Sequence, residues 1–148
     1  KINDICSKRN ESNMFTTMFV GKIDLDTLEM EYCNAGHNPI IIIAPDGSAR
    51  YIHAKANLAI GLFPDFPYQK ESLKIEKGSR ILVYTDGVSE AENAAKELYG
   101  EDRLLEFAGS EPAQTDSRQF AADLLANVRS FTLGNPQNDD ITMMSIKL

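Results

Sequence analysis

Cysteine, clustered basic residues and long apolar runs are all scarce in this sequence, and each scarcity argues against a class of protein. The 148 residues include 2 cysteines, Cys6 and Cys33, without Cys-x-x-Cys spacing, so neither a disulfide framework nor a structural zinc site is indicated. Cys33 is expected to be a small core residue of a reduced protein. With 22 acidic against 15 basic side chains, a net charge of −7 and no basic stripe, nucleic acid is an unfavourable ligand.

The longest apolar run, residues 39–44, is far shorter than the ~20 residues needed to cross a bilayer. The sequence does not open with a signal-peptide pattern, and it shows neither internal repeats nor low-complexity linkers. We therefore expect a cytoplasmic segment without direct membrane contact, whether it stands alone or forms the cytoplasmic domain of a larger, membrane-anchored protein.

Apolar segments separated by turn residues predict a strand-rich first half. Neighbouring segments flank short turns at residues 24–27 and 45–47, which is typical of antiparallel hairpins. Three successive hairpins in a meander are expected, formed by residues 14–23 with 28–34, 39–44 with 49–53, and 68–75 with 80–85. A final short apolar run covers residues 141–146.

Helices are predicted at the start of the sequence and in its second half. Residues 1–11 read as the end of a helix. Ser89 with Glu92 forms a capping-box signature for a short helix that Ala94, Ala95, Glu97 and Leu98 favour and that ends near Gly100. Another helical turn is expected at 103–107. Asp116 is expected to cap a longer helix, which residues 134–136 end. Its apolar stripe would consist of Phe120, Leu124, Val128 and Phe131.

Acidic residues stand at the ends of two apolar runs. Asp86 directly follows the apolar segment 81–85, and Asp139 and Asp140 directly precede the segment 141–146. Each alone has a simple structural explanation, because Asp-Gly is a common turn and acidic pairs are common in solvated loops. Together they suggest a hard-metal centre, since Mg²⁺ and Mn²⁺ prefer oxygen ligands.

Five segments, in this order along nearly the whole chain, carry a family resemblance. They are residues 15–19 (FTTMF), 34–39 (NAGHNP), 59–64 (AIGLFP), 84–91 (YTDGVSEA) and 139–142 (DDIT). The sequence thereby resembles the SpoIIE/RsbU-like branch of the metal-dependent PPM serine/threonine phosphatases. The resemblance implies an α+β fold, a layered antiparallel β-sandwich flanked by helices, with two Mn²⁺ or Mg²⁺ ions at one end of the sheets.

The resemblance also implies roles for individual residues. Asp86 matches the family's Thr-Asp-Gly aspartate and Asp139 the first residue of its acidic pair, so both are expected to be metal ligands. Gly87 would let the backbone approach the metal, and Asp140 would support the site. Glu90 is either a ligand of a third, weaker metal or an exposed acid in the first turn of a helix. The nucleophile would be metal-activated water, with no catalytic Ser or Cys.

Family members carry further metal-binding aspartates in an upstream segment, which does not precede Phe15 here. Residues 1–148 are therefore expected to be a single partial phosphatase domain, N-terminally truncated and inactive as a fragment. Sheet edges left exposed by the missing part would favour a homodimer or a segment swap.

His37 has two readings, a general acid or part of a strand-to-strand turn. Imidazole titrates near neutrality, but Asn34 and Gly36 favour the turn, and the acid-type histidine of the family belongs to the upstream segment. His53 has no motif support. The loop 54–67 is either a cover beside the active site or a crossover between sheets.

The expected function of the intact protein is hydrolysis of phosphoserine or phosphothreonine on a regulatory protein. The resemblance implies a bacterial substrate such as a STAS-domain anti-sigma-factor antagonist, and thus sigma-factor regulation. Two alternatives are a degenerate phosphatase-like binding or sensory module, and a β-rich interaction domain whose acidic turns are purely structural.

Overall fold

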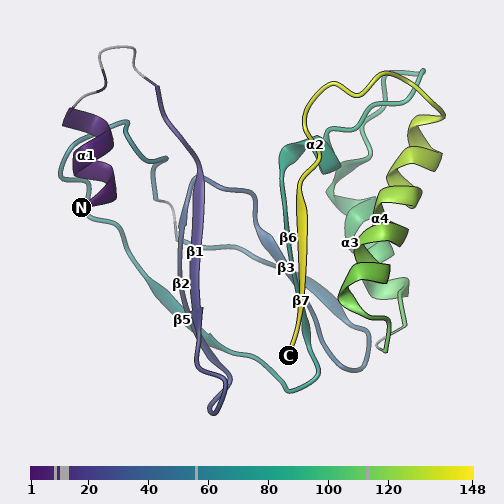
Figure 1. Ribbon diagram of the computed structural model, residues 1–148, viewed down its shortest axis with the longest axis horizontal. Helices are drawn as coiled ribbons and strands as arrows, with labels where there is room; N and C mark the ends of the chain where they lie inside the picture. Colours follow the sequence, from purple (N-terminus) through teal and green to yellow (C-terminus); the bar gives the residue numbers. More distant parts are fainter. Residues whose placement is uncertain (9, 11–13, 56, 113) are drawn as a thin grey trace. The chain divides into compact units, whose positions relative to one another are not determined.

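The computed structural model describes residues 1–8, 10, 14–55, 57–112 and 114–148, and the chain divides into two compact units. One unit comprises Lys1–Pro39 with His53–Ile75, and the other comprises Ile40–Ile52 with Glu76–Leu148. Each unit contains one antiparallel sheet together with helix (Figure 1). The predicted α+β class is confirmed.

The first unit has a three-stranded sheet in the order β1 (Met18–Ile23), β2 (Glu29–Ala35), β5 (Glu71–Lys74). The first predicted hairpin is confirmed, because β2 pairs antiparallel with β1 over the whole length of β1. Asp24 fixes the turn between them by accepting hydrogen bonds from the backbone N–H groups of Asp26 and Thr27. Helix α1 (Ile2–Lys8) lies within the predicted stretch 1–11, of which residues 9 and 11 are outside the described residues.

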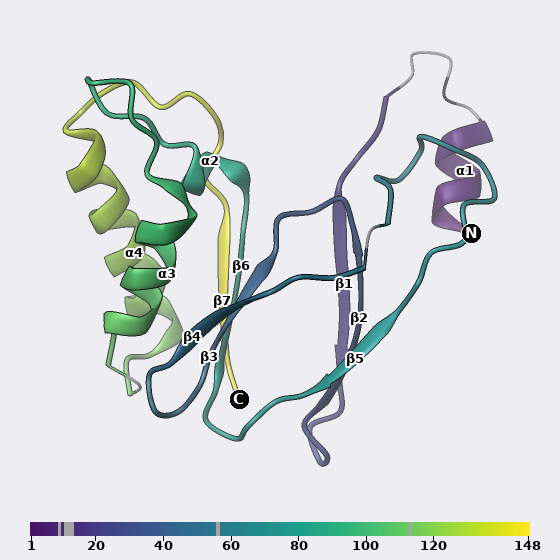
Figure 2. The same ribbon diagram turned by 180° about the vertical axis from the view of Figure 1, so that it is seen from behind.

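The second unit has a four-stranded sheet whose order is β4 (Ala49–Ile52), β3 (Ile40–Ile43), β6 (Arg80–Tyr84), β7 (Met143–Lys147). The second predicted hairpin is confirmed by the antiparallel β3–β4 pair. Helices α3 (Gly100–Ser110) and α4 (Ser117–Thr132) pack side by side against this sheet, as both views show (Figures 1 and 2). The buried core between sheet and helices includes Ile41, Leu82, Tyr84, Leu104, Phe120, Leu124 and Val128.

Helix α4 follows the sequence prediction closely. The Asp116 side chain accepts hydrogen bonds from the backbone N–H groups of Arg118 and Gln119, as an N-cap does. Phe120, Leu124 and Val128 are buried on one face, and the helix ends with Leu133 in the left-handed conformation at φ 49°. Among the helices described, none has the length and apolar character required to span a membrane.

The short helix predicted to begin after a Ser89 cap and end near Gly100 is wrong. Helix α2 (Asp86–Ser89) begins earlier, at Asp86, so Ser89 ends a helix instead of capping one. The Asn93 side chain accepts hydrogen bonds from the N–H groups of Ala95 and Glu97, which stabilises a turn in competition with a helix. Gly100 begins α3 instead of ending the preceding segment, and α3 extends well beyond the predicted turn at 103–107.

The third predicted hairpin is also wrong. Strand β5 pairs with β2 in one sheet, whereas β6 pairs with β3 and β7 in the other. The strands are antiparallel, as predicted, but their partners are distant in sequence, so the meander breaks after β4. The loop 54–67, whose residue 56 is outside the described part, connects β4 of one sheet to β5 of the other, as its crossover interpretation expects.

Candidate metal centre

Asp86 lies immediately beyond the C-terminal end of the central strand β6. The strand ends at Tyr84, Thr85 is the N-cap of α2, and Asp86 is the first helical residue. The Asp86 carboxylate accepts a hydrogen bond from the Gly87 N–H at 3.0 Å and is exposed to solvent. The C-terminal end of a buried strand thus places a solvent-accessible carboxylate at a fixed position at one end of the sheet.

Asp139 and Asp140 lie in the loop that leads into β7, the neighbour of β6 in the sheet. The Asp139 carboxylate accepts a hydrogen bond from the Asp140 N–H at 2.7 Å. The Gln137 side-chain amide donates to the Asp139 carbonyl oxygen at 2.7 Å. Both aspartates are exposed, so their carboxylates are open to an ion from solvent.

Thr85 connects the two acidic segments and was not predicted as a site residue. Its hydroxyl donates to the Asp140 carbonyl oxygen at 3.0 Å and accepts from the Thr142 N–H at 3.0 Å. Its backbone N–H also donates to the Thr142 carbonyl oxygen, at 3.0 Å. One side chain therefore fixes the loop of Asp139 relative to the strand end of Asp86. The signal for it was present in the sequence, as the residue preceding the Asp-Gly pair.

Gly87 lies directly against the acidic pair. A Cβ atom at Gly87 would overlap the Asp140 carbonyl group, with its carbon at 2.8 Å, and would stand 3.2 Å from the Asp139 carbonyl oxygen. Gly87 is buried. The absence of a side chain is what allows the α2 turn and the 139–140 backbone to come into contact, so glycine is required here for space.

Carboxylates of this kind suit a hard cation such as Mg²⁺ or Mn²⁺. The residue types of Asp86 and Asp139 therefore fit a metal centre, and the Thr85 and Gly87 contacts bring their two segments together. Within the described part of the chain, however, no group of three or more His, Cys, Asp or Glu side chains could hold a metal ion. The pair fits part of a metal site.

Glu90 is the C-cap of α2, and its N–H donates to the Asp86 carbonyl oxygen at 2.7 Å. It is exposed. Its interpretation as an acid in the first turn of a helix is wrong, because the helix begins four residues earlier than predicted. One helical turn from Asp86, Glu90 remains close to the candidate centre along the chain.

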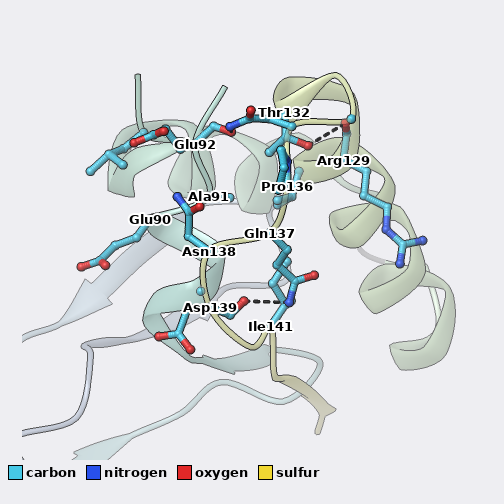
Figure 3. Close-up of a pocket in the computed structure, with 15 residues that line it drawn as sticks. Glu90, Ala91, Glu92, Arg129, Thr132, Pro136, Gln137, Asn138, Asp139 and Ile141 are labelled. Atoms are coloured by element: carbon cyan, nitrogen blue, oxygen red, sulfur yellow. Dashed lines mark hydrogen bonds between the residues drawn. The ribbon is translucent and has the colours of Figure 1, made fainter. Parts of the chain in front are cut away.

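A cavity of about 590 Å³ adjoins the acidic pair. Its wall is formed by α2 and the segment after it, the end of α4, and the loop 134–141, as Figure 3 shows. The Asn135 side chain donates to the Glu92 carbonyl oxygen at 2.9 Å, which connects two sides of the cavity. Carboxylate, amide and aliphatic groups all line it, among them Glu90, Leu98, Val128, Asn135, Asn138, Asp139 and Ile141.

The turn interpretation of His37 is confirmed. The Asn34 side chain accepts from the His37 N–H at 2.8 Å and donates to the His37 carbonyl oxygen at 2.8 Å, while Gly36 adopts φ 76°. Cys33 is half-buried instead of being a core residue. Burial raises the pKa of its thiol, and the Glu71 carboxylate adds to the effect.

The family model of Stage II sporulation protein E (SpoIIE) matches residues 1–148, the whole chain. The chain belongs to the SpoIIE family. The SpoIIE/RsbU-like branch of the PPM phosphatases, to which the sequence motifs pointed, is therefore confirmed.

Two curated relatives illustrate the similarity. Protein IcfG of Synechocystis is 32% identical over 144 residues, which cover 96% of this chain and 22% of IcfG. Phosphoserine phosphatase RsbU of Bacillus subtilis is 26% identical over 148 residues, covering 99% of this chain and 43% of RsbU. The SpoIIE-family chain described here thus spans less than half the length of either relative.

Solved structures agree on the fold. The PP2C phosphatase domain of SpoIIE from Bacillus subtilis, solved with a fragment of its regulatory domain, matches with a TM-score of 0.81 at 22% identity, over 98% of this chain and 42% of that one. Related structures include a SpoIIE phosphatase domain presoaked with Mn and RsbX in complex with magnesium. Proteins of this fold have thus been solved after presoaking with Mn and in complex with magnesium.

Proposed function

We propose that this chain is part of a metal-dependent phosphatase domain that hydrolyses phosphoserine or phosphothreonine on a regulatory protein. The observation that carries the proposal is the contact between the two acidic segments: Thr85 bonds to Asp140 and Thr142, and Gly87 leaves room for the Asp139–Asp140 backbone. Membership of the SpoIIE family, with phosphoserine phosphatase RsbU among the relatives, supports the reaction type.

In this proposal Asp86 and Asp139 are direct ligands of Mn²⁺ or Mg²⁺. Two such ions, when bound, supply an activated water nucleophile and neutralise charge on the phosphoryl group. Thr85 positions the Asp139 loop, Gly87 permits the close approach of backbone, and Asp140 supports the outer part of the site. Glu90, one helical turn after Asp86, is the candidate for a third, weaker site.

The isolated chain is proposed to be inactive. Its described residues offer too few clustered metal-binding side chains for a complete centre, and a two-metal site needs several carboxylates. The remaining ligands would come from a further part of the phosphatase domain, so that residues 1–148 form one portion of it. The sheet edges would then favour pairing with that portion or, without it, a homodimer or segment swap.

The cavity beside Asp139 is the proposed place for the polypeptide around the phosphorylated residue. Its volume of about 590 Å³ and its mixture of amide and aliphatic groups suit a short stretch of polypeptide. A STAS-domain anti-sigma-factor antagonist in the cytoplasm is the proposed substrate, on the basis of the family resemblance.

A binding or sensory module without catalysis is the second candidate. The small number of clustered ligand side chains in the described residues favours it, since a degenerate domain would keep the fold without a complete centre.

The deciding experiment is phosphate release from a phosphoserine protein by the intact protein that contains this chain, with Mn²⁺, Mg²⁺ or chelator. Metal-dependent release that Asp86→Ala abolishes is the expected result, with the 148-residue chain inactive beside it. Absence of release across metals and substrates would favour the binding module. Equal activity of the 148-residue chain would overturn the claim of an incomplete centre.

A further inference from the structure

A second, smaller cavity in the first unit gathers basic side chains. The sequence contains 2 histidines, and both of them, His37 and His53, line this one cavity of about 190 Å³. Lys55 lines it as well, and none of the lining residues is acidic among those the structure describes. In a chain with a net charge of −7, such a concentration of basic groups needs an explanation.

The ring of His37 is held in one orientation. Its Nδ1 lies 3.0 Å from the Asn38 carbonyl oxygen, and because a carbonyl oxygen can only accept, Nδ1 carries the hydrogen. Nε2 is therefore the nitrogen without a hydrogen in the neutral ring. The turn beneath is fixed by the two bonds between Asn34 and the His37 backbone.

The backbone on the other side of the cavity is fixed too. The Lys55 N–H donates to the Glu71 carboxylate, and the Asn57 side chain bonds to the Gln69 backbone in both directions, at 2.9 and 3.0 Å. No ion pair to the Lys55 ammonium is found in the described residues. Its charge is thus available to a ligand.

Two further titratable groups lie near this cavity. Glu71 is a nearby carboxylate, and it accepts a hydrogen bond from the Lys55 backbone N–H. Cys33 lies 3.6 Å from the Asn57 amide nitrogen, and burial, which raises the pKa of its thiol, keeps it neutral near pH 7. Glu71 thus offsets part of the positive charge, and Cys33 adds no negative charge.

We propose that the cavity lined by His37, His53 and Lys55 binds a tetrahedral oxyanion of the phosphate class. Imidazolium and ammonium groups donate strong, charge-assisted hydrogen bonds to phosphate oxygens. A metal ion is the poorer occupant, because the cavity offers only two imidazoles and places an ammonium beside them. The proposal does not rest on the proposed phosphatase activity.

The test is a titration of the full protein with inorganic phosphate, in chelator, followed by the NMR signals of the two histidine rings. Both rings should shift together as phosphate is added. His37→Gln and Lys55→Gln should each weaken binding about tenfold, as the loss of one charged hydrogen bond implies. Lys22→Gln, at a position that does not line the cavity, should bind phosphate as the wild type does.

Two further titrations, one with a phosphoserine peptide and one with Zn²⁺, show whether the bound phosphate belongs to a protein and whether a metal ion binds instead. A phosphoserine peptide that binds at least tenfold more tightly than inorganic phosphate would identify a phosphoprotein as the source, and equal affinity would identify the free anion. The unphosphorylated peptide should not shift the rings. The proposal is overturned if phosphate moves neither ring, if His37→Gln, still folded by circular dichroism, binds phosphate unchanged, or if Zn²⁺ shifts both rings while phosphate does not.

Discussion

At the scale of single residues, Gly87 gives the sharpest expectation. Gly87→Ala would place a methyl group 2.8 Å from the Asp140 carbonyl carbon, so the acidic loop must move. Overpacking of this kind costs about 1–3 kcal/mol of the free energy of unfolding, and it should also weaken Mn²⁺ binding by the intact protein. Denaturant unfolding and metal titration measure the two effects.

Gly109→Ala is the matched control. Gly109 lies in α3, where a Cβ would meet only ordinary contacts, at 3.5 Å from the Gly47 carbonyl oxygen and 3.8 Å from the Ala49 Cβ. Alanine at a helical position should raise stability by about 0.5–1 kcal/mol. Equal behaviour of the two variants would contradict the close approach at Gly87.

Thr85→Val removes the hydroxyl that joins Asp140 to Thr142 while keeping the shape of the side chain. The Thr142 N–H and the Asp140 carbonyl oxygen then lose a partner, which should cost about 1–2 kcal/mol. In the intact protein the affinity for Mn²⁺ should fall, because the Asp139 loop is no longer fixed. An unchanged metal affinity would show that the Thr85 hydroxyl does not position this loop.

The residues of the site were only partly predictable from the sequence. Asp86 and Asp139 stood out because a carboxylate at the end of an apolar strand is a recognisable pattern. The overlap between Gly87 and Asp140 could not be foreseen, because it depends on two segments more than fifty residues apart coming into contact. Glu90 was misread as a first-turn acid since the start of α2 was placed too late.

At the scale of elements, the cap of α4 makes stability depend on pH. The N–H of Gln119, and then that of Arg118, lower the pKa of the Asp116 carboxyl from its ordinary value of 3.8. The stabilisation is therefore fully present above that value and is lost as the pH falls through the lower pKa of the folded state. Asp116→Asn keeps a side-chain oxygen that can accept the capping hydrogen bonds, but this side chain does not ionise.

Unfolding free energies of wild type and Asp116→Asn, measured from about pH 6 down to about pH 3, test this dependence. The wild type should lose stability relative to the Asn variant as the pH falls through the acidic end of the range. Asp116→Ala should be less stable than either at neutral pH. A constant difference between wild type and Asp116→Asn would contradict the lowered pKa.

The Arg80 side chain connects β6 to β7 and to the segment before α4. Its side chain is 4% exposed, donates to the Ser145 hydroxyl at 2.6 Å and to the Thr115 carbonyl oxygen, and stacks 4.4 Å from the Phe120 ring centre. Arg80→Met leaves these polar groups without a donor and should cost about 3 kcal/mol in denaturant unfolding. Burial lowers the pKa of the guanidinium, but arginine stays charged.

The same substitution at an exposed position is the control for Arg80. Arg103 also stacks on an aromatic ring, 4.7 Å from the Phe131 ring centre, but its side chain is exposed. Arg103→Met should cost less than about 1 kcal/mol, since polar groups near the surface find water. Similar losses for both variants would show that Arg80 acts through ring stacking alone.

Element prediction succeeded where the signal was local. Asp116 and the stripe of Phe120, Leu124 and Val128 fixed α4 in advance, since cap and periodicity agree. The helix predicted after Ser89 is absent because the Asn93 side chain accepts hydrogen bonds from the backbone N–H groups of Ala95 and Glu97 and stabilises a turn, although alanine and glutamate favour a helix in isolation. Local preference therefore predicted α4 correctly, whereas the side-chain hydrogen bonds of Asn93 overrode it after α2.

At the scale of the whole molecule, strand pairing was the least predictable feature. The hairpins β1–β2 and β3–β4 follow from short turns, but β5 and β6, joined by a short connection, belong to different sheets. Their partners β2 and β3 are far away in sequence, and turn residues carry no information about such pairing. The α+β class was nevertheless correct, because it needs only the types of element and not their partners.

The central claim is that Asp86 and Asp139 serve one metal centre, and Mn²⁺ affinity of the intact protein tests it most directly. The affinity would be measured by calorimetric titration for wild type, Asp86→Asn, Asp139→Asn and the double variant. If both carboxylates hold the same ion, each single variant should lose most of the affinity and the double variant little more, because sites that share a ligand are not additive. Independent, additive losses, or wild-type affinity in either single variant, would contradict the shared centre.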